Sequence, residues 1–293
     1  MAQSSREIRR RIKSVKNIGQ ITKAMELVSA SKMRKAQMAA AASRPYSVLS
    51  SELLENLLGR VPHTAHNLIK RLMPEYTKIK PQHKALIILI SSDRGLAGSL
   101  NTNVINEALN IVKDAGAEKT DFISVGKKGT DAIRRQGLNL TAVFQGKDRN
   151  LSIQDAKPIA QVSIDDFLNW TYDKVYVVST DFVSTLVQKP KVLQILPLAK
   201  KTDRNATDDY IFEPDSDAVL EDVIYRYIEF AIYQSMQEAA ASEHSARMVA
   251  MRNANEAASE LIDDLTLSAN QARQANITRE LSEISAAKLA MEG

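Results

Sequence analysis

Apolar side chains recur at steps of three and four residues near the start of the chain, the spacing of one helical stripe. The stripe consists of Ile8, Ile12, Val15, Ile18, Ile21, Met25 and Val28. Its mean step lies slightly below 3.5, so the contact seam should drift around the helix. Because no proline precedes Pro45, the pattern predicts a helix from Ser5 to about Arg44, roughly 60 Å long. Residues 51–59 continue this helix or form a second one.

The C-terminal segment is the longest uninterrupted one, because residues 215–292 contain neither glycine nor proline. A single helix of this length would measure about 115 Å. Its early part carries a wide apolar stripe, and its later part a thin stripe of mostly small residues: Ala254, Ala258, Leu261, Leu265, Ala272 and Ala275. Small residues let two helices approach closely. No helix of this length is stable alone in water, so we expect the two terminal helices to pair.

The middle of the chain alternates strand and helix patterns. Short apolar runs predict strands at 85–91, 120–126, 140–144 and 174–180, and residues 184–198 are strand material that Pro190 breaks. Helices are predicted at 101–116, 127–137 and 156–173. This alternation is typical of an α/β domain with a mainly parallel sheet. The chain therefore divides into a helix at 1–58, a linker at 59–84, an α/β domain at 85–205 and a helix at 210–293.

The two ends of the chain carry opposite charge, although the net charge is only +4. Residues 1–35 contain ten basic and two acidic residues, a balance of +8. Residues 215–293 contain six basic and fourteen acidic residues, a balance of −8. A basic end alone would suggest nucleic acid or anionic lipid as a partner. The matching acidic end suggests that the two ends meet each other or meet different partners.

Few residues suggest chemistry. The chain lacks cysteine, which excludes disulfides and thiolate metal sites, and no apolar run of about 18 residues would span a membrane. The loop SSDRGLAGSLN (91–101) could face a phosphate with its backbone, but it matches neither dinucleotide nor P-loop spacing, so a structural turn is favoured. His63 and His66 lack a third ligand nearby. No catalytic residue, metal site or cofactor is predicted.

Three segments resemble the gamma subunit of F-type ATP synthases. IKSVKNIGQITKAMELVSASKMRKAQ (12–37), continued by SRPY (43–46), is similar to the first-helix motif of that family. SSDRGLAGSLN (91–101) resembles its loop after the first strand, and residues 246–284 resemble its C-terminal motif. The family commonly has Cys and Gly where this chain has Ala97 and Ser99, and the tail 285–293 is more polar than usual. The start of the motif near residue 1 argues against a transit peptide and favours a bacterial source.

The resemblance implies a fold and a set of partners. The terminal helices would form an antiparallel coiled coil inside a ring of three alpha and three beta subunits. The inserted Rossmann-like α/β domain would join the epsilon subunit and the c-subunit ring, at the cytoplasmic face of a bacterial plasma membrane. The expected function is a non-catalytic rotor shaft that couples proton flow to ATP synthesis or hydrolysis. The alternative is a non-rotary coiled-coil scaffold with an α/β docking domain.

The resemblance also implies a few site residues. Arg247, Gln274, Thr278 and Glu280 match positions that make polar contacts with a beta-subunit loop. Met25 matches a first-helix position near the acidic lever loop of beta. Met25 also fits the apolar stripe, so a purely structural role in the seam remains open.

Overall fold

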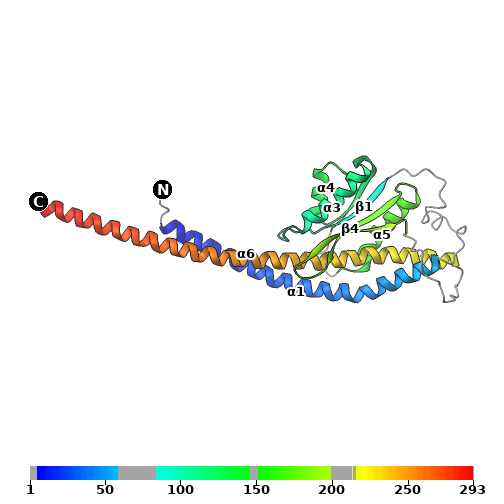
Figure 1. The fold of residues 1–293 in the computed structure, drawn as a ribbon, viewed down its shortest axis with the longest axis horizontal. Coiled ribbons are helices and arrows are strands. Elements are labelled where there is room, and N and C mark those ends of the chain that lie inside the picture. The colour runs from blue at the N-terminus through cyan, green and yellow to red at the C-terminus, as the bar shows by residue number, and fades with distance from the viewer. Residues whose placement is uncertain (1–4, 59–83, 146–150, 199–212, 214–215, 293) are drawn as a thin grey trace. The chain divides into compact units, whose positions relative to one another are not determined.

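The structure is a computed structural model that describes residues 5–58, 84–145, 151–198, 213 and 216–292 (Figure 1). The chain forms two compact units, which are considered separately below. Unit 1 comprises residues 1–29 and 247–293, and unit 2 comprises residues 30–246. The predicted division into helix, linker, α/β domain and helix stays a prediction, and the linker falls almost wholly outside the described residues.

Unit 2 contains a five-stranded sheet of order β3-β2-β1-β4-β5. The strands are β1 (Ala85–Ile90), β2 (Thr120–Val125), β3 (Asn139–Phe144), β4 (Lys174–Phe182) and β5 (Gln188–Leu196). β1 to β4 run parallel, and β5 pairs antiparallel with β4. The predicted α/β domain with a mainly parallel sheet is therefore confirmed.

β5 differs from the sequence-based expectation, because it runs through Pro190 without a break. Thr180 of β4 stands opposite Pro190 in the register of the two strands. Proline is tolerated at the edge of a sheet, where its missing N–H need not serve a second neighbour. β5 is the last strand of the described sheet, so Pro190 fits there.

Shorter helices connect the strands: α3 (Leu100–Ala115), the 3₁₀ turn η2 (Ala117–Lys119), α4 (Lys127–Arg135) and α5 (Ile153–Leu168). α5 begins three residues earlier than predicted and ends five earlier. Its start is fixed by a capping box, in which the Ser152 backbone N–H donates to Asp155 Oδ2 at 3.0 Å. The helices α3 and α4 lie close to the ranges that the sequence pattern predicts.

The sheet is buried on both faces, which explains the continuous apolar run of β1. All six residues of β1 are buried. One face packs with α3 and α4 through residues such as Ile87, Val104 and Ile133. The other face packs with α5 and with parts of the terminal helices through Ile88, Ile164 and Ile228, among others.

The terminal helices are α1 (Ser5–Leu58) and α6 (Ser216–Glu292), and each contributes to both units. α1 continues through Pro45, so residues 51–58 extend the first helix rather than form a second one. In unit 1, Glu26 bonds Arg252 while Gly19 lies near Ala258, so the two helices run antiparallel. In unit 2, Ser43 bonds Gln234 and Arg44 bonds Glu238. The predicted antiparallel coiled coil is confirmed.

No described helix is both long and apolar enough to cross a membrane.

The turn at Gly126 yields a first testable prediction. Its backbone has a φ of 95°, and an added Cβ would lie 2.1 Å from the carbonyl oxygen of Ser91. Gly116 has the same φ but nothing within 4 Å of such a Cβ. Gly126→Ala should therefore lower the free energy of unfolding by several kcal/mol, against about 1–2 kcal/mol for Gly116→Ala. Equal losses for the two variants in urea denaturation would contradict the close contact.

Candidate functional site

The contact seam of α1 in unit 1 follows a regular heptad spacing. Buried or half-buried side chains and backbone lie at positions 8, 12, 15, 19, 22, 26 and 29, and Met25 is also half-buried. The steps alternate between four and three, a mean of 3.5 that keeps a seam facing one partner. The prediction that the contact seam drifts around α1 is therefore wrong from residue 18 onward, because the seam keeps its heptad spacing there.

Three residues of the predicted apolar stripe face outward instead. Ile18, Ile21 and Val28 are 54%, 59% and 56% exposed. The seam there consists of small and polar residues: Gly19, Thr22, Glu26 and Ser29. A Cβ at Gly19 would lie 3.7 Å from Ala258 Cβ, so the small residues let the two helices come close. The larger apolar residues are thereby left on the outer surface of the pair.

On α6 the predicted seam is partly confirmed. Ala258 is buried, and Ala254, Leu265 and Ala272 are half-buried, whereas Leu261 and Ala275 are exposed. From residue 273 to 288 every side chain is exposed, because this part of α6 extends past the beginning of α1 (Figure 1). Ile277, Leu281 and Ile284 follow one another at steps of four and three along it. These residues form an exposed apolar stripe on this part of α6.

One carboxylate lies inside the seam. Glu26 is only 6% exposed, and its oxygens accept bonds from Lys23 Nζ at 3.0 Å and Arg252 Nε at 3.3 Å. The Lys23 hydrogen bond is the largest influence that lowers the pKa of Glu26, with Arg252 adding to it. The carboxylate therefore stays ionised at neutral pH, and α1 is tied to α6 by a charged contact.

The sign of this contact reverses the expectation from net charge. Glu26 places an acid on the basic helix, and Arg252 places a base on the acidic helix. In unit 2, by contrast, Arg44 Nη2 of α1 lies 3.4 Å from Glu238 Oε1 of α6, as the net charges predict. Local geometry, and not the +8 and −8 totals, decides which charges meet.

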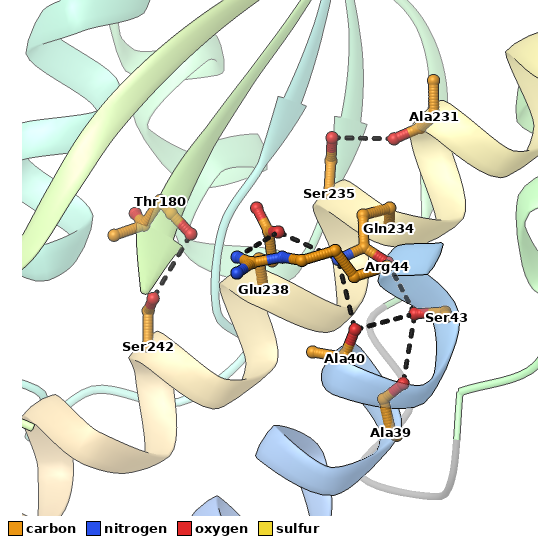
Figure 2. A network of polar contacts seen from close by, with 10 residues as sticks. All are labelled: Ala39, Ala40, Ser43, Arg44, Thr180, Ala231, Gln234, Ser235, Glu238 and Ser242. Atoms are coloured by element: carbon orange, nitrogen blue, oxygen red, sulfur yellow. Dashed lines mark hydrogen bonds and ion pairs between the residues drawn. The ribbon is translucent and has the colours of Figure 1, made fainter. Parts of the chain in front are cut away.

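The helices of unit 2 are joined by a polar network that Figure 2 shows. Ser43 Oγ donates to Gln234 Oε1, and Gln234 Nε2 donates to Glu238 Oε1 at 2.9 Å. Arg44 reaches the same carboxylate. On the other side of α6, Ser242 Oγ donates to the carbonyl oxygen of Thr180 at 3.3 Å, which ties the helix to β4. α6 is thus held by polar bonds both to α1 and to the sheet.

The structure brings only some of the expected site residues together. Gln274 and Thr278 are exposed and four residues apart on α6, so they share one face. Glu280 is exposed but lies two residues further on, on a different face. Arg247 is 7% exposed and stands about 40 Å from Gln274 along the helix. Met25 is half-buried next to Glu26 in the sequence. The roles of these five residues stay predictions.

The loop at 91–99 connects β1 to α3 and contacts the start of α4. It provides acceptors for the first N–H groups of α4: Asp93 Oδ1 for Lys127, the Ser92 carbonyl for Lys128 and Ser91 Oγ for Gly129, at 2.8 to 3.0 Å. These are the donors that a bound phosphate would need at that helix end. Because the protein itself uses them, the loop does not offer α4 as a phosphate site.

A cavity of about 180 Å³ lies beside this loop, within unit 2. It is lined from β1, β4 and both long helices, at the carboxyl ends of the strands, where open α/β sheets usually bind ligands. Ser92 and Gln237 line it, but Ser92 Oγ donates to the Arg94 carbonyl and Gln237 Nε2 to the Leu151 carbonyl. Residues of both long helices thus form part of the cavity wall at this edge of the sheet.

The described part of the chain contains no cluster of three His, Asp or Glu side chains suited to a metal ion. His63, His66 and His83 lie outside the described residues, and His244 lies on α6.

These features define a class of protein, in which two long antiparallel helices carry an inserted α/β domain. Comparison with known sequences gives the family. The sequence model of the family described as ATP synthase matches residues 4–291. The ATP synthase gamma chain of Pelotomaculum thermopropionicum is 44% identical over 291 residues, 99% of each chain. That of Herpetosiphon aurantiacus is 44% identical over 301 residues, covering 98% of this chain and 99% of the relative. The chain belongs to the ATP synthase gamma chain family.

Solved structures share the fold. The rotor of the Euglena gracilis mitochondrial ATP synthase in rotational state 1 aligns with a TM-score of 0.64 and 20% identity, covering 93% of this chain and 98% of that one. A chain of its OSCP/F1/c-ring structure in rotational state 3 aligns with a TM-score of 0.67 and 21% identity, covering 98% and 94%. The fold class expected from the sequence is confirmed.

The close contact in the seam generates a second prediction. Ala258→Leu should push α1 and α6 apart at Gly19 and cost about 1–3 kcal/mol of unfolding free energy. Ala257→Leu, at the exposed neighbouring position, should change it by less than about 0.5 kcal/mol. Thermal unfolding of both variants, followed by circular dichroism, measures the difference. A seam that tolerates leucine at both positions equally would contradict the packing described.

Proposed function

We propose that this chain is the central rotor subunit of an F-type ATP synthase, where it couples proton flow to ATP synthesis or hydrolysis at the beta subunits. The observation that carries the proposal is the outward placement of Ile18, Ile21, Leu27 and Val28 around a narrow helix pair. Exposed apolar residues on a long helix need a cover. A ring of three alpha and three beta subunits supplies that cover, and membership of the gamma chain family supports this identification.

The polar seam and the apolar outer surface of the helix pair are suited to a rotating shaft. Chemically identical beta subunits are held in different states only if the shaft contacts each of them differently. Reversing a two-state population from 1:99 to 99:1 requires about 5.5 kcal/mol of differential interaction. One exposed ion pair contributes under about 1 kcal/mol. The coupling must therefore be spread over many contacts, and the mixed charged and apolar surface of the helix pair provides them.

The chain takes a non-catalytic role in this proposal. The donors at the start of α4 are used by the 91–93 loop, and both long helices line the cavity at the sheet edge. ATP chemistry then belongs to the beta subunits, and no cofactor is assigned to this chain. The α/β domain would join the epsilon subunit and the c-subunit ring, which places the protein peripherally at the cytoplasmic face of a bacterial plasma membrane. A non-rotary scaffold is not favoured, because the relatives are ATP synthase gamma chains.

Five residues receive roles in this proposal. Gln274, Thr278 and Glu280 are assigned to contacts with a beta-subunit loop, which their exposure on the last part of α6 supports. Arg247 is assigned to the same kind of contact on its likeness to the family motif alone, since its side chain is mostly buried. Met25 is assigned to coupling, which its place beside the charged Glu26 contact supports.

A third prediction concerns Met25. Met25→Lys adds an ammonium group to α1 at the position before Glu26 and offers a new cation to an acidic loop of beta. The complex should assemble normally but pump fewer protons per ATP hydrolysed. Proton uptake by membrane vesicles, divided by the ATPase rate, measures this ratio. Met25→Leu serves as the control, because it keeps an apolar side chain of similar volume. An unchanged ratio in the lysine variant would refute the coupling role.

Reconstitution tests the proposal as a whole. Mixing the full chain with alpha and beta subunits should yield a complex that contains one copy of this chain per three alpha and three beta subunits. The complex should hydrolyse ATP, and the isolated chain should not. Failure to co-purify with the hexamer, or ATP hydrolysis by the chain alone, would overturn the proposed function.

A further inference from the structure

The charged contact of Glu26 lies among small and polar residues in the seam of unit 1. Its neighbours in the α1 seam are Gly19, Thr22 and Ser29, none of which has a large apolar side chain to insert between residues of α6. Interlocking apolar side chains normally determine how far one helix can slide along another. Between Gly19 and Ser29 the half-buried Met25 is the one large apolar side chain that α1 contributes to the seam, so a further interaction has to help fix the alignment of the two helices.

We propose that Glu26 is a positioning residue that fixes the register of α1 against α6 through Arg252. The inference rests on the proposed function, since it assigns this contact a part in keeping the rotor aligned. A single buried polar residue at a seam position is a recognised way to specify register in a coiled coil, at some cost in stability.

The geometry supports this role in two ways. Lys23 lies three residues before Glu26 on the same helix and holds one carboxylate oxygen at 3.0 Å. The second oxygen is left to accept from Arg252 Nε of the opposite helix at 3.3 Å. Lys23 therefore orients the carboxylate of Glu26. The bond from Arg252 to this oriented carboxylate then fixes how α6 is aligned with α1.

A slip along the seam would be penalised at this position. Moving α1 by one helical turn shifts it by about 5.4 Å, which breaks the bond between Glu26 and Arg252. Glu26 would then lose the partner on α6 that compensates its burial, a penalty larger than the bond itself contributes. Gly19 and Ala258 oppose the same slip only weakly, because either could pack against another small residue.

Another ion pair on these helices provides a matched control. Asp222 and Arg226 form a bond of 2.7 Å within α6, and both side chains are about 60% exposed. That pair joins no two helices and can fix no register. Asp222→Asn thus removes one carboxylate from an ion pair without touching the alignment of α1 and α6.

The first test measures register directly by disulfide formation in the full chain, which contains no native cysteine. Gly19→Cys with Ala258→Cys places two Cβ atoms near 3.7 Å, within the range of a disulfide. Gly19→Cys with Ile262→Cys reports a slip of about one turn. Both pairs are introduced into the parent chain and into chains with Glu26→Gln, Arg252→Gln, Arg252→Lys or Asp222→Asn.

The proposal predicts a specific pattern of cross-linking rates. Glu26→Gln and Arg252→Gln should slow the 19–258 disulfide at least about fivefold and accelerate the 19–262 disulfide. Arg252→Lys, which keeps a cation, and Asp222→Asn should stay close to the parent. Helix content, followed by circular dichroism, separates slipped chains from unfolded ones, and Arg252→Gln leaves the Lys23–Glu26 bond in place. Parent-like rates in both glutamine variants would overturn the proposal.

The second test asks whether register matters to the assembled enzyme. Complexes with alpha and beta subunits and the membrane sector should pump fewer protons per ATP with Glu26→Gln than with Asp222→Asn. Arg252→Lys should restore the ratio that Arg252→Gln loses. Lost register with unchanged pumping would overturn the part that this contact is assigned in the working rotor, whereas failure of the parent chain to assemble would count against the proposed function instead.

Discussion

The close approach of two helices through small residues is the constraint on which unit 1 depends. Gly19 and Ala258 bring the backbones of α1 and α6 together, and the seam around them has room for Thr22, Ser29 and one buried carboxylate. Because the seam is narrow, large apolar side chains such as Ile21 must point outward. A helix pair built this way cannot bury its own apolar surface. This exposed apolar surface fits the proposed place of the helix pair inside a ring of subunits.

Unit 2 has a large apolar core around its sheet, although apolar side chains such as Leu49 and Leu186 are exposed on its surface. The sheet is covered on both faces, and the loop after β1 provides acceptors for the beginning of α4. In this unit the edge of the sheet where ligands usually bind faces the chain's own α1 and α6. Such a domain suits transmission of a turning force, which needs stiffness and firm attachment rather than a binding pocket.

Much of the fold could be predicted from the sequence because its elements carry strong local patterns. The run ALIILI predicts a strand buried on both faces, and the stretch after residue 215 without glycine or proline predicts a long helix. The seam of α1 could not be found from apolar residues alone, since Gly19, Thr22, Glu26 and Ser29 form part of it. Counting small and polar residues at a strict 4-3 spacing would have found it.

Other features depend on contacts between distant residues, which local patterns do not show. Pro190 is accommodated because β5 lies at the edge of the described sheet. Asp93 accepts a hydrogen bond from the backbone N–H of Lys127, 34 residues away. The pairing of Glu26 with Arg252 spans 226 residues and contradicts the net charges of the two ends. Among the expected site residues, the burial of Arg247 followed from no local pattern, whereas the exposure of Gln274 and Thr278 agrees with a contact role.

Rotation of this chain within an alpha–beta hexamer is the central claim, and it can be observed directly. A probe attached through Lys113→Cys, at an exposed position on α3 in this cysteine-free chain, would report the motion of the α/β domain while the hexamer is fixed to a surface. During ATP hydrolysis the probe should turn in one direction and pause at three orientations, one for each beta subunit. Steady ATP hydrolysis with a probe that does not turn would contradict the account.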